Sequence, residues 1–184
     1  RRSIRNFRDE LVPEEKIRQL LEAARFAPTA ANSQGMYYLV IQDRDLIKKI
    51  TDCVADWMQE QIDNKSPQKR YFIKVLHVYR ERGIDIIGRN ARQLIFVLAR
   101  RLNVTGPSNS EQSLAYAELY APTLGLGTTI MGFIETCLRA DYAPLRELLQ
   151  IPTKQVGVGC LLVGYPRYRY HKLVDRQHLK VEFR

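Results

Sequence analysis

Apolar side chains recur at steps of three and four residues in two stretches of the N-terminal third. In residues 13–27 they are Ile17, Leu20, Leu21 and Ala24, and in residues 43–63 they are Leu46, Ile47, Ile50, Val54, Trp57, Met58 and Ile62. This spacing places the apolar groups on one side of a helix. Pro13 favours a first helical turn and Pro28 stops the pattern. We therefore expect an amphipathic helix in each stretch, with Trp57 as a core anchor.

Three other stretches are almost continuously apolar. They are residues 36–41, 94–99 and 155–163, and each is rich in branched or aromatic side chains. Short runs of this kind are typical of buried strands. Because both helices and strands are expected, the pattern predicts an α+β chain.

Serine, glycine and proline mark further boundaries in the second half. Ser108 or Ser110 is expected to cap a helix, and Gly125 is expected to end it in a left-handed backbone conformation. Residues 128–133 are too small and too rich in glycine for a plain strand. They predict either a close backbone approach to a flat ligand or a helix-to-strand connection. Pro144 then opens a short helix.

The segment from Asp63 to Asn90 gives weaker signals. One apolar face of a helix is formed there by Tyr71, Phe72, Val75, Leu76 and Tyr79. These side chains either pack into the core or line a pocket, and the pattern does not choose between the two.

Length and composition restrict the class of protein. The chain has 184 residues and 45% hydrophobic content, which suits one domain over residues 1–184. Its apolar runs are far shorter than the ~20 residues of a membrane span, so we expect a soluble, cytoplasmic protein.

Cys53, Cys137 and Cys160 are widely separated in apolar surroundings. We expect buried free thiols there and no bound metal.

The net charge of +9 has two interpretations. One is a basic nucleic-acid-binding module, which the interleaved tyrosines and arginines of residues 165–170 would suit. The other is an ordinary solvated surface together with a site for phosphorylated cofactors. The scattered positions of the cations favour the second interpretation.

Two short pieces carry the candidate chemistry. The first, residues 1–5, contains three arginines and Ser3, a set of donors suited to a phosphate dianion. The second, residues 28–34, contains Asn32 and Gln34, whose amides match the edge of a planar heterocycle. The predicted helix between them would fix their distance, so that one segment holds both phosphate and ring. The alternative for residues 1–5 is a solvated basic terminus.

These pieces, in this order, resemble the flavin-dependent nitroreductase family. The resemblance lies in the Arg-Arg-Ser-x-Arg start, the Ala-x-x-Ala-Pro end of the first helix and the Asn32-Ser33-Gln34 loop. The segment 125–133 and the tail from Val163 to Arg176 agree with it. Arg92 stands where the family usually has proline, which puts the local turn geometry in question. The family resemblance implies a three-layer α/β/α sandwich with a mostly antiparallel central sheet and an intertwined homodimer.

The resemblance also implies a flavin oxidoreductase that uses FMN, with NADH or NADPH as electron donor and a nitroaromatic or quinone as small acceptor. The implied cofactor-binding residues are Arg1, Arg2, Ser3, Arg5, Thr29, Ala30, Asn32, Gln34, Thr129, Ile130, Met131, Gly132 and Arg176. Arg1, Arg2, Ser3 and Arg176 would hold the phosphate, and Arg5 would stabilise charge at the pyrimidine end of the ring. No side chain is needed as a general acid.

Other features stay open at this stage. Residues 63–90 correspond to a variable, pocket-covering region of the family. The chain begins inside the arginine motif, which indicates missing upstream residues, and relatives with this type of tail carry a ferredoxin domain that could deliver electrons. Relatives also remove halogens or break down the flavin itself, so different flavin chemistry is an alternative.

Overall fold

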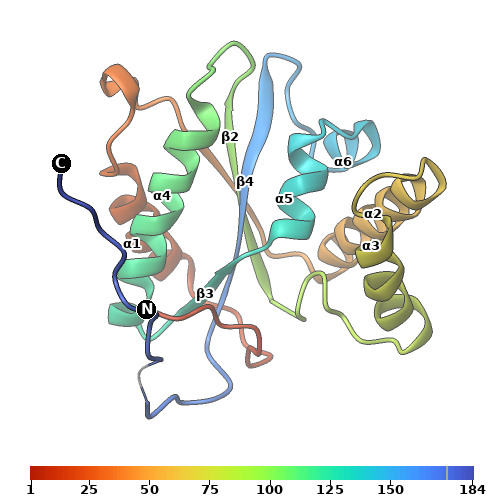
Figure 1. Cartoon of the computed structure of the whole chain (residues 1–184), viewed down its shortest axis with the longest axis horizontal. Coiled ribbons are helices and arrows are strands. Elements are labelled where there is room, and N and C mark those ends of the chain that lie inside the picture. Colours follow the sequence, from red (N-terminus) through yellow and green to blue (C-terminus); the bar gives the residue numbers. More distant parts are fainter. Residues whose placement is uncertain (173) are drawn as a thin grey trace.

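The computed structural model describes residues 1–172 and 174–184 and has one four-stranded sheet between two layers of helices (Figure 1). The strand order is β1-β2-β4-β3, and all three neighbouring pairs are antiparallel. The strands are β1 (Tyr37–Ile41), β2 (Gln93–Arg100), β3 (Gly127–Ile130) and β4 (Gln155–Gly164). The expected three-layer sandwich with a central antiparallel sheet is confirmed.

Helices cover both faces of the sheet. They are α1 (Glu14–Arg25), α2 (Arg44–Asp63), α3 (Lys69–Leu76), α4 (Gly106–Tyr120), α5 (Gly132–Arg139) and α6 (Ala143–Leu148), with short helical turns η1 (Ala30–Asn32), η2 (His77–Glu81) and η3 (Ala121–Leu124). Helices α1 and α4 lie on one face, and α2, α3, α5 and α6 lie on the other (Figure 1).

Alternate side chains of β2 pack into two separate hydrophobic cores. Leu94 and Phe96 pack with the α2, α3, α5 and α6 layer, while Ile95 and Val97 pack with α1 and α4. Successive side chains of a strand point to opposite faces, so a strand with no polar face must be covered on both sides. Trp57 is buried and meets the Phe72 ring edge-on at 5.6 Å, as a core anchor should.

The helix predictions from periodicity are confirmed for α1, α2 and α6. Helix α2 begins after Asp43, whose carboxylate accepts hydrogen bonds from the backbone N–H groups of Asp45 and Leu46 at 2.8 and 3.0 Å. Such a cap satisfies donors that have no partner inside the helix.

The expected cap of α4 was wrong. The helix begins at Gly106, after Thr105, and neither Ser108 nor Ser110 is its cap. Pro107 explains the difference, because proline in the first turn gives up a backbone N–H that has no helical partner there. Gly125 does end this region, with φ of +72°, as predicted.

Two strand predictions need correction. The first strand was expected to be buried, but β1 is an edge strand and Tyr37 is mostly exposed. The apolar composition of β1 does not show whether the strand lies at the edge or in the interior of the sheet. Residues 128–133 were judged too small for a plain strand, but residues 127–130 form β3, because β4 supplies a full antiparallel ladder next to them.

The three cysteines are free, as expected. Cys137 and Cys160 are buried and Cys53 is half-buried. Burial, with the nearby carboxylates of Asp56 and Glu60, raises the pKa of the Cys53 thiol to about 11. A thiol with that pKa stays protonated near neutral pH, which makes it a weak nucleophile.

Candidate functional site

The N-terminal segment is fixed against the sheet by backbone hydrogen bonds. The N–H of Ile4 donates to the carbonyl of Thr128 on β3, and the N–H of Arg8 donates to the carbonyl of Tyr165 just after β4, both at 2.8 Å. The side chains of Ile4 and Phe7 are buried. The segment therefore extends the sheet beyond β3 and leaves Arg5 exposed to solvent.

Two glycines allow this close approach. A Cβ atom on Gly127 would lie 2.5 Å from Cγ1 of Ile4, and one on Gly164 would lie 2.9 Å from Cδ1 of Phe7. Both distances are too short for real contacts, so larger residues at either position would push the segment away. The two glycines thus help to place the arginines.

A cavity of about 890 Å³ lies where the N-terminal segment, β3 and the C-terminal tail meet. We call it the N-terminal cavity. It brings together five of the residues expected to bind a cofactor: Arg1, Arg2, Ser3, Arg5 and Arg176. They come from opposite ends of the sequence, and Figure 1 shows the N-terminus beside the tail. Thr128, Leu126 and Tyr168 also line this cavity.

Two of its arginines already have partners within the chain. Arg1 forms an ion pair with Glu118 of α4, which is only 4% exposed. Arg2 stacks on the Tyr170 ring, 4.2 Å from its centre, and donates to the carbonyl of Lys172. The Oε1 atom of Glu118 is buried and has no hydrogen-bond partner among the described residues. A buried acceptor in that state is available to a donor from a ligand.

The second predicted piece lies elsewhere on the same chain. The N–H of Ala30 donates to Oδ1 of Asn109, near the start of α4, at 3.1 Å. Glu118, beside Arg1, is nine residues further along the helix, which corresponds to about 14 Å. Thr29, Ala30, Asn32 and Gln34 do not line the N-terminal cavity. Within one chain the two pieces therefore do not line the same cavity, and their contact with one cofactor stays a prediction.

The loop of Thr29 to Gln34 nevertheless has an unusual backbone. Ala31, Asn32 and Gln34 all have φ near +50°, a region that residues other than glycine seldom adopt. Residues 30–34 are exposed, and Gln34 Nε2 donates to Asn32 Oδ1 at 3.2 Å. Strained backbone of this kind is concentrated at functional sites in proteins.

The residues expected near the flavin ring fall into two groups. Thr129 and Met131 are buried, and the N–H of Met131 donates to the carbonyl of Cys160, so it is not free for a ligand. Ile130 and Gly132 are exposed. Gly132 is the first residue of α5 and has open space where a Cβ would stand. Ile130 and Gly132 are the accessible members of this segment.

Sequence reasoning missed Arg89, which lies near Arg5. Burial, and then the positive charge of Arg5, lower the pKa of the Arg89 guanidinium. Its Nε is buried without a hydrogen-bond partner among the described residues. Arg89 lies in a turn with φ of +56°, and the next residue, Asn90, has φ of +51°. No local motif marked this position, because its neighbour Arg5 is 84 residues away.

The turn that carries Arg89 is held by Asp85. Its carboxylate accepts hydrogen bonds from the N–H groups of Ile87, Gly88 and Asn90 at 3.1, 2.6 and 2.9 Å. Arg92, which replaces the family's proline, donates to Asp9 at 2.7 Å. The turn is thus stabilised by polar contacts instead of a proline ring.

Comparison with known proteins decides the family. A profile described as the nitroreductase family matches residues 1–165. The chain belongs to the nitroreductase family. The expectation drawn from the N-terminal motifs is therefore confirmed.

Individual relatives agree with the family assignment. The chain is 28% identical over 171 residues to an FMN reductase (NAD(P)H) of Bacillus subtilis, covering 93% of this chain and 65% of that protein. It is 25% identical over 173 residues to an iodotyrosine deiodinase of Danio rerio, covering 90% of this chain and 57% of that one. The chain thus spans about three fifths of the length of these two relatives.

Solved structures share the fold. A nitroreductase with bound FMN from Desulfitobacterium hafniense superposes with a TM-score of 0.76 at 18% identity, covering 99% of this chain and 94% of that one. At this identity the match establishes the architecture alone. Among residues 1–172 and 174–184, no helix has both the length and the apolar character needed to cross a bilayer.

The N-terminal cavity fits a phosphorylated flavin by the chemistry of its donors. Four arginines and the hydroxyl of Ser3 supply charged and neutral hydrogen-bond donors for a phosphate. The unpartnered Oε1 of Glu118 offers an acceptor for a hydroxyl group. Apolar side chains of Ile4 and Leu126 complete the lining. The residues present are thus compatible with FMN.

Proposed function

We propose that this nitroreductase-family chain is an FMN-dependent oxidoreductase that takes electrons from NADH or NADPH and delivers them to a small acceptor such as a nitroaromatic or a quinone. The observation that carries this proposal is the gathering of Arg1, Arg2, Ser3, Arg5 and Arg176 around one cavity. The family assignment and the name of the Bacillus relative, an FMN reductase, support it.

Each residue has a distinct task in this proposal. Arg1, Arg2, Ser3 and Arg176 bind the phosphate. Arg5, with Arg89 near it, places positive charge at the pyrimidine end of the ring. Gly132 offers its N–H at the start of α5. When bound, FMN supplies the hydride and electron transfer between nicotinamide and acceptor.

The loop of Thr29 to Gln34 acts, in our proposal, from a second copy of the chain. It does not line the N-terminal cavity of its own chain, yet it is exposed and strained. Helix α4 also exposes apolar side chains, namely Tyr116, Leu119 and Tyr120, with 64% of Leu119 accessible. An apolar helix face of this kind is typical of a subunit interface. We propose a homodimer in which each site uses both subunits.

Residues 63–90 form one wall of the acceptor pocket in this proposal. The ring of Tyr71 lies 5.6 Å from that of Phe133, which follows Gly132 at the start of α5. Tyr71 is 58% exposed, so core packing does not explain its position. An aromatic pair next to the proposed flavin suits a flat acceptor.

Since the three cysteines of the chain are unpaired, we place the protein in the cytoplasm.

Titration with FMN tests the proposal directly. The purified protein should retain flavin at about one equivalent per subunit in its visible spectrum and should run as a dimer in light scattering. Under anaerobic conditions it should oxidise NADH or NADPH when a quinone or nitroaromatic is present. A protein that binds no FMN would refute the cofactor assignment, and a monomer with stoichiometric flavin would refute the shared site. Salt-sensitive retention of DNA by a flavin-free protein would instead support the nucleic-acid alternative.

A second flavin reaction is favoured by the similarity to iodotyrosine deiodinases. Reductive removal of a halogen also uses the electrons of a reduced flavin, so the binding residues named above would be the same. Anaerobic turnover with a panel of quinones, nitroaromatics and halogenated phenols separates the two. Halide release without quinone or nitroaromatic reduction would replace the first proposal.

A further inference from the structure

A second cavity of about 820 Å³ is lined by Arg89, and we call it the Arg89 cavity. Four separate parts of the chain form it: the end of the N-terminal segment, the first turns of α2, the turn before β2, and Arg167. Its charged lining residues include Arg8, Asp9, Asp85, Arg89, Arg92 and Arg167.

Cations outnumber carboxylates in this lining by six to three. Moreover, two of the carboxylates are already occupied. Asp85 accepts hydrogen bonds from three backbone N–H groups of its own turn. Asp9 is shared by Arg44 and Arg92, whose hydrogen bonds lower the pKa of its carboxyl. The structure therefore leaves a surplus of positive charge facing the cavity.

Three guanidinium groups carry most of this surplus. Arg8, Arg89 and Arg167 donate no side-chain hydrogen bond to any described residue, and the Nε atoms of Arg89 and Arg92 are buried without an acceptor. Arg89 is half-buried, and a cation held away from water is costly unless an anion compensates it, whereas Arg8 and Arg167 are exposed. Fork-shaped donors that converge in this way match a phosphate or carboxylate.

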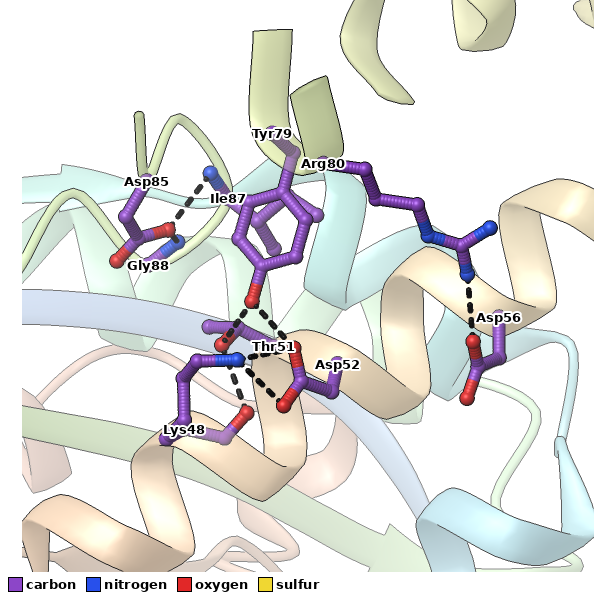
Figure 2. A network of polar contacts seen from close by, with 9 residues as sticks. All are labelled: Lys48, Thr51, Asp52, Asp56, Tyr79, Arg80, Asp85, Ile87 and Gly88. Carbon is purple, nitrogen blue, oxygen red and sulfur yellow. Dashed lines mark hydrogen bonds and ion pairs between the residues drawn. The ribbon is translucent and has the colours of Figure 1, made fainter. Parts of the chain in front are cut away.

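The wall formed by α2 is already fixed by a polar network. The Tyr79 hydroxyl lies 2.8 Å from both Thr51 Oγ1 and Asp52 Oδ1, and the ammonium of Lys48 is paired with the same Asp52 carboxylate (Figure 2). Figure 2 also shows the Asp85 turn, with its carboxylate directed at the N–H groups of Ile87 and Gly88. Both walls are thus formed before any ligand arrives, which lowers the entropy cost of binding.

We propose that the Arg89 cavity binds a phosphomonoester dianion, with Arg8, Arg89 and Arg167 as its principal donors. Two sources share this chemistry: the 2′-phosphate of NADPH and free inorganic phosphate. The first rests on the proposed function, and it is supported by the chain itself, because Arg5 lines the N-terminal cavity and the residues that follow it, Asn6 to Arg8, line this one. In that case the cavity makes the enzyme prefer NADPH over NADH.

Calorimetric titration of FMN-saturated protein tests the site, because FMN then blocks the N-terminal cavity. The probes are adenosine 2′,5′-bisphosphate, adenosine 5′-monophosphate and inorganic phosphate, at constant ionic strength. At least tenfold tighter binding of the bisphosphate than of the 5′-monophosphate supports the NADPH source. Equal binding of inorganic phosphate and the bisphosphate supports the free-phosphate source. If none of the three probes binds, the proposal is overturned.

Two variants with opposite expected effects on probe binding are used, because misfolding could explain a loss of binding but not a gain. Arg8→Ala with Arg167→Ala should weaken binding of the tightest probe about tenfold or more. Asp9→Asn should strengthen it about threefold or more, because Arg44 and Arg92 are then released to the ligand. The control is Arg18→Ala with Arg25→Ala, which removes two exposed cations of α1 that are paired within their own helix. It should bind as the parent does.

These results are separable from a failure of the proposed function. If the protein binds no FMN, the same titrations are run on the variant Arg1→Ala with Arg5→Ala, whose Arg89 cavity is unchanged. Retained probe binding there supports the Arg89 site on its own. Unchanged affinity in both the Arg8/Arg167 variant and Asp9→Asn would show that the probes bind elsewhere, and the proposal would fall.

Discussion

The two basic cavities differ in how their cations are neutralised. In the N-terminal cavity a single carboxylate, Glu118, is buried under Arg1. In the Arg89 cavity three carboxylates are present, but Asp85 supports a turn and Asp9 divides its charge between Arg44 and Arg92. A count of charges alone therefore does not say how much positive charge is left unpaired in each cavity. The contacts of each carboxylate decide how much positive charge remains for a ligand.

The cavities also differ in how their cations lie along the sequence. Arg1, Arg2 and Arg5 form a contiguous motif that is visible at once. Arg8, Arg89 and Arg167 are dispersed over almost the whole chain and belong to no motif. A contiguous cluster and a folded cluster can thus offer similar chemistry, although only the first can be recognised from residue order.

The largest expected effect comes from removing Arg1 and Arg5 together. Each charged hydrogen bond contributes about 1.5–3 kcal/mol, so FMN affinity should fall about 100-fold or more. Binding of adenosine 2′,5′-bisphosphate should change less than threefold, because neither residue lines the Arg89 cavity. Fluorescence titration with FMN and calorimetry with the bisphosphate measure the two effects. Equal losses for both ligands would mean that the cavities are one site.

A smaller effect is expected for Asp85→Ala, which removes the acceptor of three backbone N–H groups. Gly88 is buried, so the loss should cost about 2 kcal/mol and lower Tm by about 4–8 °C. Binding of the bisphosphate should also weaken, because the turn that carries Arg89 loses the hydrogen bonds that hold it. Asp85→Asn keeps an acceptor and is the matched control, with less than half the change. An unaltered Tm in Asp85→Ala would show that these hydrogen bonds contribute little.

Glu118→Gln should strengthen FMN binding in the N-terminal cavity. The substitution removes the negative charge beside Arg1, so FMN affinity should rise about threefold to tenfold while the flavin-free protein loses about 1 kcal/mol of stability. Fluorescence titration and thermal unfolding measure the two quantities. Glu111→Gln changes an exposed glutamate of the same helix and is the control. Weaker FMN binding would show that the ligand needs the negative charge of Glu118, and not only the acceptor oxygen that Gln also supplies.

The smallest effect concerns pH in the Arg89 cavity. Hydrogen bonds from Arg44 and Arg92 lower the pKa of Asp9, so its pairing is complete above its unfolded value and is lost only as the pH falls through the still lower folded value. Between pH 5 and 7 Asp9 therefore stays charged, and no histidine lines the cavity. Bisphosphate affinity should rise severalfold over this range, because the phosphomonoester loses its second proton near pH 6. A flat profile would indicate that the monoanion binds equally well.

Much of the fold followed from local patterns. Helices α1 and α2 were predicted by apolar spacing, and β2 and β4 by continuous apolar runs, because burial of a face requires those periods. The same patterns misjudged β1 and β3. Whether a strand is an edge or an interior strand depends on its neighbours, which residue order within the strand does not encode.

The candidate site was predicted in part. The gathering of Arg1, Ser3 and Arg176 was expected from the family resemblance, and the structure places them at one cavity. The loop of Thr29 to Gln34 does not line that cavity within one chain, because the length of α1 does not determine the direction in which its neighbouring segments fold back. The roles proposed for these residues stay predictions until the titrations are made.

By itself the sequence determined α1, α2, β2, β4 and the contiguous arginine motif, since each of these depends on residues close together in the chain. Tertiary structure alone decided that Glu118 faces Arg1, that Arg89 approaches Arg5, and that Asp9 is divided between two arginines. The physical reason is that electrostatic interactions depend on distance in space and on burial, and both are fixed only when remote segments pack together.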